Sequence, residues 1–117
     1  SNMLHQAGKI ANKRERNKFI KWLDNFEFKN LKLPRPDKVY FLDVPPAISK
    51  KLANERADLK AGTKKDIHEQ DEQHLINAYN AGKEVAKKYK WITIPCTDQN
   101  DNLKSIEEIH QEILKLL

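Results

Sequence analysis

Glycine is scarce in this sequence. The 117 residues include only three glycines, Gly8, Gly62 and Gly82. Gly8 and Gly82 are each followed by a lysine, but neither lysine is followed by serine or threonine, so the phosphate-binding pattern G-x-x-x-x-G-K-[ST] cannot be written over any part of the chain. Because that pattern cradles nucleotide phosphates with backbone amides, these residues contain no P-loop. Any chemistry on a nucleotide phosphate would need that cradle from another polypeptide segment.

Cysteines and long hydrophobic runs are also nearly absent. The single cysteine, Cys96, excludes an intramolecular disulfide. This favours a reducing compartment, and we expect a cytoplasmic protein. A thiol that ends an apolar run is more often a small buried residue than a nucleophile, so we expect no catalysis by Cys96. No apolar run approaches the roughly 20 residues of a membrane-spanning helix, and we expect no contact with a membrane.

The composition that remains is typical of one small, helix-rich domain. Charged residues make up 33% of the chain and hydrophobic residues 38%, which is a globular rather than a disordered balance. The formal net charge of +5 comes from lysines spread along the chain. It suits a phosphorylated ligand or nucleic acid in general, but it forms no single basic block. We treat residues 1–117 as a single domain or a fragment of one.

A helix and a loop are predicted before the first strand. From Asn17 onward, apolar residues recur at helical spacing after a polar run at 12–18. These residues are Phe19, Ile20, Leu23 and Phe26, with Trp22 beside them. Segment 33–37 contains two prolines, which remove backbone donors and push the preceding residues toward extended geometry. We therefore expect a loop at 33–37.

Two short apolar runs predict strands. Residues 39–44 are nearly all apolar, which is typical of a strand buried on both faces, and residues 91–96 repeat this pattern. Pro46 fits the first turn of a helix that runs to about Ala57. The polar stretch 58–66 predicts a mobile loop before a long helix. One face of that long helix carries Leu75, Tyr79, Gly82, Ala86 and Tyr89.

A last helix follows the second strand. Ser105 and Glu108 form an S-x-x-E capping box at its start. Its apolar stripe consists of Ile106, Ile109, Ile113 and Leu116. Strands separated by helices imply a parallel α/β sheet with helices on both faces. Two strands are too few to stand alone, so we expect a partner or self-association, either at the unpaired edge of strand 39–44 or through the apolar face that holds Phe19 and Leu23.

The order of these motifs resembles thymidylate kinase, the P-loop enzyme that passes the γ-phosphoryl group of ATP to dTMP. The most diagnostic string is Phe41-Leu42-Asp43-Val44-Pro45-Pro46. Residues 1–9 resemble the segment after the family's D-R-Y-x-x-S motif, and residues 19–37 resemble its helix and its L-x-x-P-x-P-D entry. Residues 65–69 resemble the family's lid exit. Residues 91–109 resemble its last strand and its S-I-E-E-I-H helix. The resemblance covers essentially the whole chain, but only about the carboxy-terminal half of the enzyme. It implies part of a P-loop nucleoside monophosphate kinase fold, with parallel strands flanked by long helices.

The resemblance also implies roles for individual residues. Ser1, Asn2, His5 and Gln6 would line the dTMP site, where an amide can pair with the thymine edge. Related enzymes often carry a tyrosine at the position of His5. The alternative for these residues is a polar helix start. Arg56 would be the catalytic cation of a lid-like loop at about 56–68, where a guanidinium can bridge transferring oxygens, unless it is a solvated charge.

On the other side, Cys96, Thr97 and Asp98 would border the adenine of ATP, mostly through backbone contacts. Mg²⁺ would arrive with ATP and be held chiefly by segments outside this chain, so no residue here is assigned as a metal ligand. Asp43 ends a strand, where it could contact magnesium or the lid, or cap the next helix. His68 and His74 are six residues apart and do not have the spacing of H-E-x-x-H, so metal binding by this pair is not expected.

Two alternative functions are expected, one from the resemblance to the family and one from the residues by themselves. The resemblance implies that the complete enzyme, commonly a homo-oligomer, phosphorylates dTMP to dTDP with ATP and Mg²⁺, and that this chain alone is inactive. The residues by themselves also allow a small non-catalytic α/β domain that uses its basic charge to bind nucleic acid or protein. No recognised nucleic-acid-binding motif supports that alternative, and we do not expect nucleic acid to be the partner.

Overall fold

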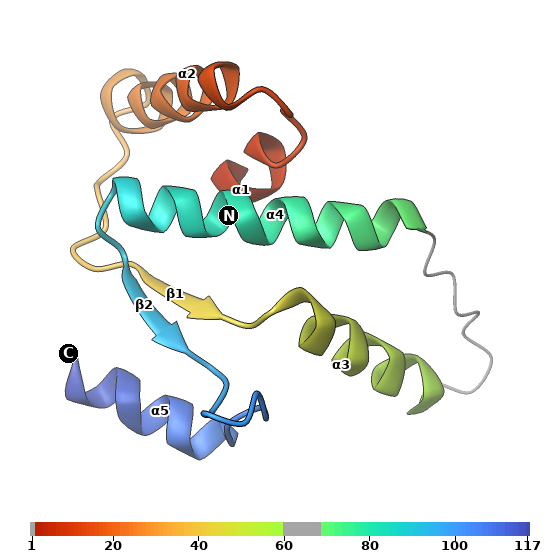
Figure 1. Ribbon diagram of the computed structural model, residues 1–117. Coiled ribbons are helices and arrows are strands. Elements are labelled where there is room, and N and C mark those ends of the chain that lie inside the picture. Colours follow the sequence, from red (N-terminus) through yellow and green to blue (C-terminus); the bar gives the residue numbers. More distant parts are fainter. Residues whose placement is uncertain (1, 60–68) are drawn as a thin grey trace.

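The computed structural model describes residues 2–59 and 69–117 (Figure 1). The elements in chain order are α1 (Asn2–Ala7), α2 (Lys13–Asn25), the π-helical turn η1 (Phe26–Asn30), β1 (Tyr40–Asp43), α3 (Pro46–Leu59), α4 (Glu69–Lys88), β2 (Ile92–Pro95) and α5 (Ile106–Lys115). The two strands pair in parallel, with Tyr40 opposite Ile92 and Asp43 opposite Pro95. The predicted α/β class and the parallel pairing are confirmed. In the described residues, no helix combines the length and the apolar character needed to cross a membrane.

Helix α2 begins earlier than the apolar spacing predicts. Its first residue is Lys13 rather than Asn17, because the Asn12 side chain accepts a hydrogen bond from the Glu15 amide at 3.1 Å and caps the helix. The polar run at 12–18 is therefore mostly helical. The helix then continues into the π-helical turn, in which the Leu31 amide donates to the Phe26 carbonyl at 2.9 Å. Segment 33–37 follows without helix or strand, as predicted.

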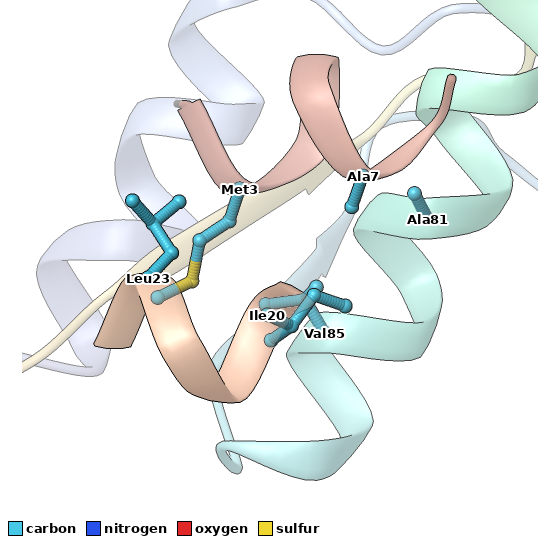
Figure 2. Packing of buried hydrophobic residues seen from close by; sticks show 6 residues of the cluster. All are labelled: Met3, Ala7, Ile20, Leu23, Ala81 and Val85. Carbon is cyan, nitrogen blue, oxygen red and sulfur yellow. The ribbon is translucent and has the colours of Figure 1, made fainter. Parts of the chain in front are cut away.

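The main core lies between α1, α2 and α4. Its buried residues are Met3, Ala7, Ile20, Leu23, Ala81 and Val85. Figure 2 shows Ile20 against Val85 and Met3 against Leu23. The prediction of an associating face with Phe19 and Leu23 is wrong for Leu23, which is only 8% exposed and points into this core. The short helix α1 contributes Met3 and Ala7, and it agrees with the alternative expectation of a polar helix start at these residues.

Arg16 links the segment between α1 and α2 to α4 through hydrogen bonds. Its guanidinium donates from Nε and Nη2 to both carboxylate oxygens of Glu84, at 2.7 and 3.3 Å. Its Nη1 donates to the backbone oxygens of Ile10 and Ala11. One side chain therefore holds the connecting segment and α4 together.

The strands lie between α4 and α5 (Figure 1). On the α4 side, a Cβ added to Gly82 would come within 2.7 Å of the Phe41 ring, so helix and strand approach closely at this glycine. On the α5 side, the Tyr40 hydroxyl donates to the Leu116 carbonyl at 3.2 Å. The expectation that β1 is buried on both faces is wrong, because α5 leaves Leu42 47% exposed.

Helices α5 and α3 differ from the sequence predictions in two details. The amide of Glu108 donates to the Ser105 hydroxyl, so Ser105 caps α5 as predicted. Ile106 is 90% exposed, however, because it lies in the first turn and leaves the half-buried stripe to Ile109 and Ile113. Helix α3 continues to Leu59, so the first residues of the predicted loops at 56–68 and 58–66 are helical. Residues 60–68 lie outside the described part.

Candidate functional site

The carboxyl end of β1 carries a cluster of three polar side chains. The Tyr79 hydroxyl on α4 donates to Oδ1 of Asp43 at 2.5 Å, and Lys83 Nζ lies 3.9 Å from Oδ2 of the same carboxylate. Lys83 also lies over the Tyr79 ring, 5.4 Å from its centroid. Because Tyr79 and Lys83 are four residues apart, they project from the same side of α4. The cluster occupies the end of the sheet at which α/β proteins bind their ligands.

The surroundings of Asp43 favour the protonated forms of the Tyr79 hydroxyl and the Cys96 thiol. Burial raises the pKa of the Tyr79 hydroxyl above its ordinary value, and the hydrogen bond to Asp43 raises it further. Burial and the nearby Asp43 charge also raise the pKa of the Cys96 thiol. A thiol held in this way is a poor nucleophile. The Tyr79 hydroxyl is therefore the donor of the cluster, and the Asp43 side chain accepts its hydrogen bond.

Asp43 has the geometry of a positioning group rather than that of a metal ligand. Its two carboxylate oxygens face Tyr79 and Lys83, and a cation beside Lys83 would experience charge repulsion. Within residues 2–59 and 69–117, no three His, Cys, Asp or Glu side chains are grouped closely enough to hold a metal ion together. Because the Asp43 oxygens face Tyr79 and Lys83, we do not assign Asp43 as a Mg²⁺ ligand, and we derive no step through the ion.

The predicted substrate residues lie on α1. His5 and Gln6 are exposed there, while Met3 and Ala7 face the core. The His5 ring stacks on the His74 ring of α4, with centroids 5.8 Å apart. Ser1 and the side chain of Asn2 lie outside the described part of the structure. The outward position of His5 and Gln6 leaves both side chains accessible to a ligand.

Arg56 lies in the last turn of α3 and is exposed. It therefore belongs to a helix, where the sequence predicted the start of a loop. Earlier in α3, Lys50 Nζ lies 2.9 Å from a carboxylate oxygen of Glu72 on α4. This ion pair connects α3 and α4, the two helices that flank residues 60–68.

The loop after β2 is held by hydrogen bonds to the end of β1 and by hydrogen bonds within the loop. The Cys96 amide donates to the Asp43 carbonyl, and the Cys96 carbonyl accepts from the Lys104 amide. Asp98 accepts hydrogen bonds at Oδ1 from the amides of Asn100 and Asn102. Cys96 is buried, Thr97 is half-buried and Asp98 is exposed. Of the three residues predicted to border adenine, Thr97 and Asp98 therefore reach the surface.

A cavity of about 600 Å³ runs beside β1. Its walls are mainly apolar, and they include Arg35, which is paired with Asp24 through two hydrogen bonds of 3.0 and 2.9 Å. The apolar lining includes Met3, Leu4, Phe28, Val39, Phe41 and Trp91. None of the predicted site residues lines this cavity. It is therefore separate from the polar cluster at Asp43.

Among the residues that the structure describes, the predicted site residues lie on three elements, α1, α3 and the loop after β2, and they are not gathered into one pocket. The sequence patterns missed two pairings. Tyr79 was assigned to an apolar helix face, although a tyrosine on such a face usually needs a partner for its hydroxyl. No sequence signal links His5 to His74, which is 69 positions away. No protein-family model, curated protein or solved structure matches this chain.

Proposed function

We propose that the chain is the carboxy-terminal part of a thymidylate kinase-like enzyme, which phosphorylates dTMP with ATP once a P-loop segment completes the fold. The observation that carries the proposal is the sheet itself. The parallel strand β1 ends at Asp43, and Val44 and Pro45 lead directly into α3, which begins at Pro46. In the described residues, β1 has one neighbouring strand. A strand from a P-loop segment would pair with the edge of β1 that faces away from β2.

The proposed division of labour follows from the chemistry. Phosphoryl transfer is mostly positioning and neutralisation of charge, so it needs a phosphate cradle and mobile cations. The P-loop segment would supply the cradle. On this chain, His5 and Gln6 would contact the nucleoside of dTMP, and Arg56 would reach the transferring phosphoryl group from the end of α3. The Asp43–Tyr79 hydrogen bond would fix β1 against α4, and thus the direction in which α3 leaves the sheet.

A reconstitution assay tests this function. ADP release is measured with dTMP and ATP for the chain alone, for a P-loop-bearing amino-terminal half of a thymidylate kinase alone, and for the two expressed as one fusion. We expect background rates for each half and dTMP-dependent turnover for the fusion. A folded fusion without turnover would contradict the proposal. Turnover by the isolated chain would reveal a phosphate site within it.

A further inference from the structure

The outward side of α2 carries a row of cations. Arg14, Lys18 and Lys21 follow one another at intervals of four and three residues, so they share one side of the helix, and all three are exposed. Ile20 and Leu23 are buried on the opposite side of α2. In Figure 1, α2 lies at the outside of the molecule, with α1 and α4 on its inner side. We call Arg14, Lys18 and Lys21 the basic face.

An exposed indole adjoins the basic face. Trp22 lies four residues after Lys18, so the two side chains are neighbours on the helix surface. The Trp22 ring stacks on the ring of Phe26, the first residue of the π-helical turn, with centroids 5.3 Å apart and an interplanar angle of 11°. Phe19, in contrast, packs against the core. Because Trp22 is 56% exposed, a flat ring from solution can stack on it.

The cations and the indole together identify a class of ligand. Lysine and arginine side chains attract phosphates, and exposed aromatic rings stack with unpaired bases, which is the combination that binds single-stranded nucleic acid. The helical rise places Arg14 and Lys21 about 10 Å apart along α2, which is about three phosphate spacings of one strand. We propose that the basic face and Trp22 bind single-stranded nucleic acid, with the cations on phosphates and Trp22 stacked on a base.

Two features favour this ligand over a membrane or a duplex. The apolar side of α2 is buried in the core, so α2 has no apolar face to insert into a lipid surface. In a duplex the bases stack on one another and leave no base face for Trp22.

The helical spacing of the basic face explains why the sequence alone did not indicate this ligand. The lysines are spread along the chain, and only the fold of α2 gathers three cations on one side. The proposal therefore replaces the expectation that nucleic acid is not a partner. It is independent of the proposed kinase function, because the predicted site residues lie on α1, α3 and the loop after β2.

Fluorescence anisotropy of the full chain with a labelled oligodeoxyadenylate of about 12 nucleotides tests the proposal. The logarithm of the binding constant should fall against the logarithm of the salt concentration with a slope of about −2, since each of three contacts contributes about −0.7. Lys18→Ala should weaken binding and bring the slope about 0.7 closer to zero. Trp22→Ala should weaken binding roughly tenfold through the loss of one base stack. Lys51→Ala, an exposed lysine on α3, is the matched control and should bind nearly as well as the unchanged chain.

Several results would overturn this proposal. One is the absence of binding at low salt, and another is a Trp22→Ala variant that binds as tightly as the unchanged chain. A Lys51→Ala variant as weak as Lys18→Ala would make the interaction a property of net charge alone. Tighter binding of a duplex of the same length would assign the basic face to duplex DNA, and binding to phosphatidylserine vesicles but not to the oligonucleotide would assign it to a membrane.

A competition experiment separates this surface from the proposed substrate site. Excess dTMP should leave the oligonucleotide bound, whereas displacement by dTMP would place the strand at His5 and Gln6 and contradict the role of the basic face. Far-ultraviolet circular dichroism of each variant checks that α2 is still folded.

Discussion

At the scale of single residues, the Tyr79 hydroxyl has the most consequential environment. It donates a 2.5 Å hydrogen bond to Asp43 across the interface between α4 and β1. Hydrogen bonds to charged groups contribute more than those between neutral groups, and removing one partner leaves the other without its bond. Because Lys83 also approaches this carboxylate, Asp43 connects the end of β1 to two positions on one face of α4.

We predict that Tyr79→Phe lowers the free energy of unfolding by about 1–2 kcal/mol at neutral pH. The folded-state pKa of Tyr79 is raised above its ordinary value of 10.0, so the hydroxyl contributes its full stability below pH 10. That contribution is lost as the pH rises through the raised pKa. Urea unfolding of both proteins from pH 8 upward should therefore show the difference shrinking at alkaline pH.

The matched control is Tyr40→Phe. It removes a hydroxyl that donates to a backbone carbonyl of Leu116 at the exposed end of the chain, so we expect a smaller loss. If Tyr79→Phe costs no more than Tyr40→Phe, or if its effect grows with pH, the role given to the Asp43–Tyr79 hydrogen bond is wrong.

Arg56 permits a kinetic prediction in the reconstituted enzyme. A guanidinium that neutralises the transferring phosphoryl group binds it more strongly in the transition state, so Arg56→Ala should lower kcat more than it raises KM for dTMP. Losses on the order of 10³-fold are typical of such arginines. Arg56→Lys should recover only part of the rate, because an ammonium keeps the charge but loses the planar fork. Steady-state kinetics with Lys51→Ala, an exposed charge on the same helix, provides the control. Unchanged kcat in Arg56→Ala would remove Arg56 from the mechanism.

At the scale of elements, local chemistry predicts the strands and helices better than their boundaries. The apolar runs at 39–44 and 91–96, Pro46 at the first position of α3 and the Ser105 cap are all signals within a few residues, and the structure confirms each element. The early start of α2 depends on a hydrogen bond from the Asn12 side chain, which apolar periodicity does not detect. Helix α1 is fixed by packing against α4, which is far away in the sequence. The same limit applies to the His5–His74 and Asp43–Tyr79 pairs, whose partners are far apart in the sequence.

Gly82 provides a prediction about how α4 packs. An alanine would favour the helix by up to about 1 kcal/mol, but its Cβ would lie 2.7 Å from the Phe41 ring and 2.9 Å from the Leu4 side chain. Because overpacking usually costs about 1–3 kcal/mol, we expect Gly82→Ala to destabilise the protein despite its better helix propensity. Thermal unfolding measures the effect. Asn80→Ala, an exposed change on the same helix, should be neutral or slightly stabilising. A stabilised Gly82→Ala would mean that α4 does not approach β1 and α1 as closely as described.

At the scale of the whole molecule, the sheet is the least complete part. Its two strands lie between α4 and α5, while the largest buried cluster lies between the helices α1, α2 and α4. The Ile92 amide donates to the Val39 carbonyl, and the Cys96 amide donates to the Asp43 carbonyl. In a parallel pair, this pattern directs the backbone groups of alternate residues toward β2 and those between them toward the opposite edge. The backbone groups of Tyr40 and Leu42 therefore point to the edge at which a further strand would pair.

This geometry predicts the amide hydrogen exchange of β1. In the isolated chain, the amides of Phe41 and Asp43 should be protected by their bonds to β2, whereas those of Tyr40 and Leu42 should exchange quickly. In the fusion with a P-loop segment, the Tyr40 and Leu42 amides should become protected as well, because the added strand accepts their hydrogen bonds. Residue-resolved exchange measured by NMR tests both states. Protection of the Tyr40 and Leu42 amides that appears in the isolated chain as its concentration rises would mean that the β1 edge pairs with a second copy. Protection of these two amides in the isolated chain at every concentration would contradict the open edge described for β1.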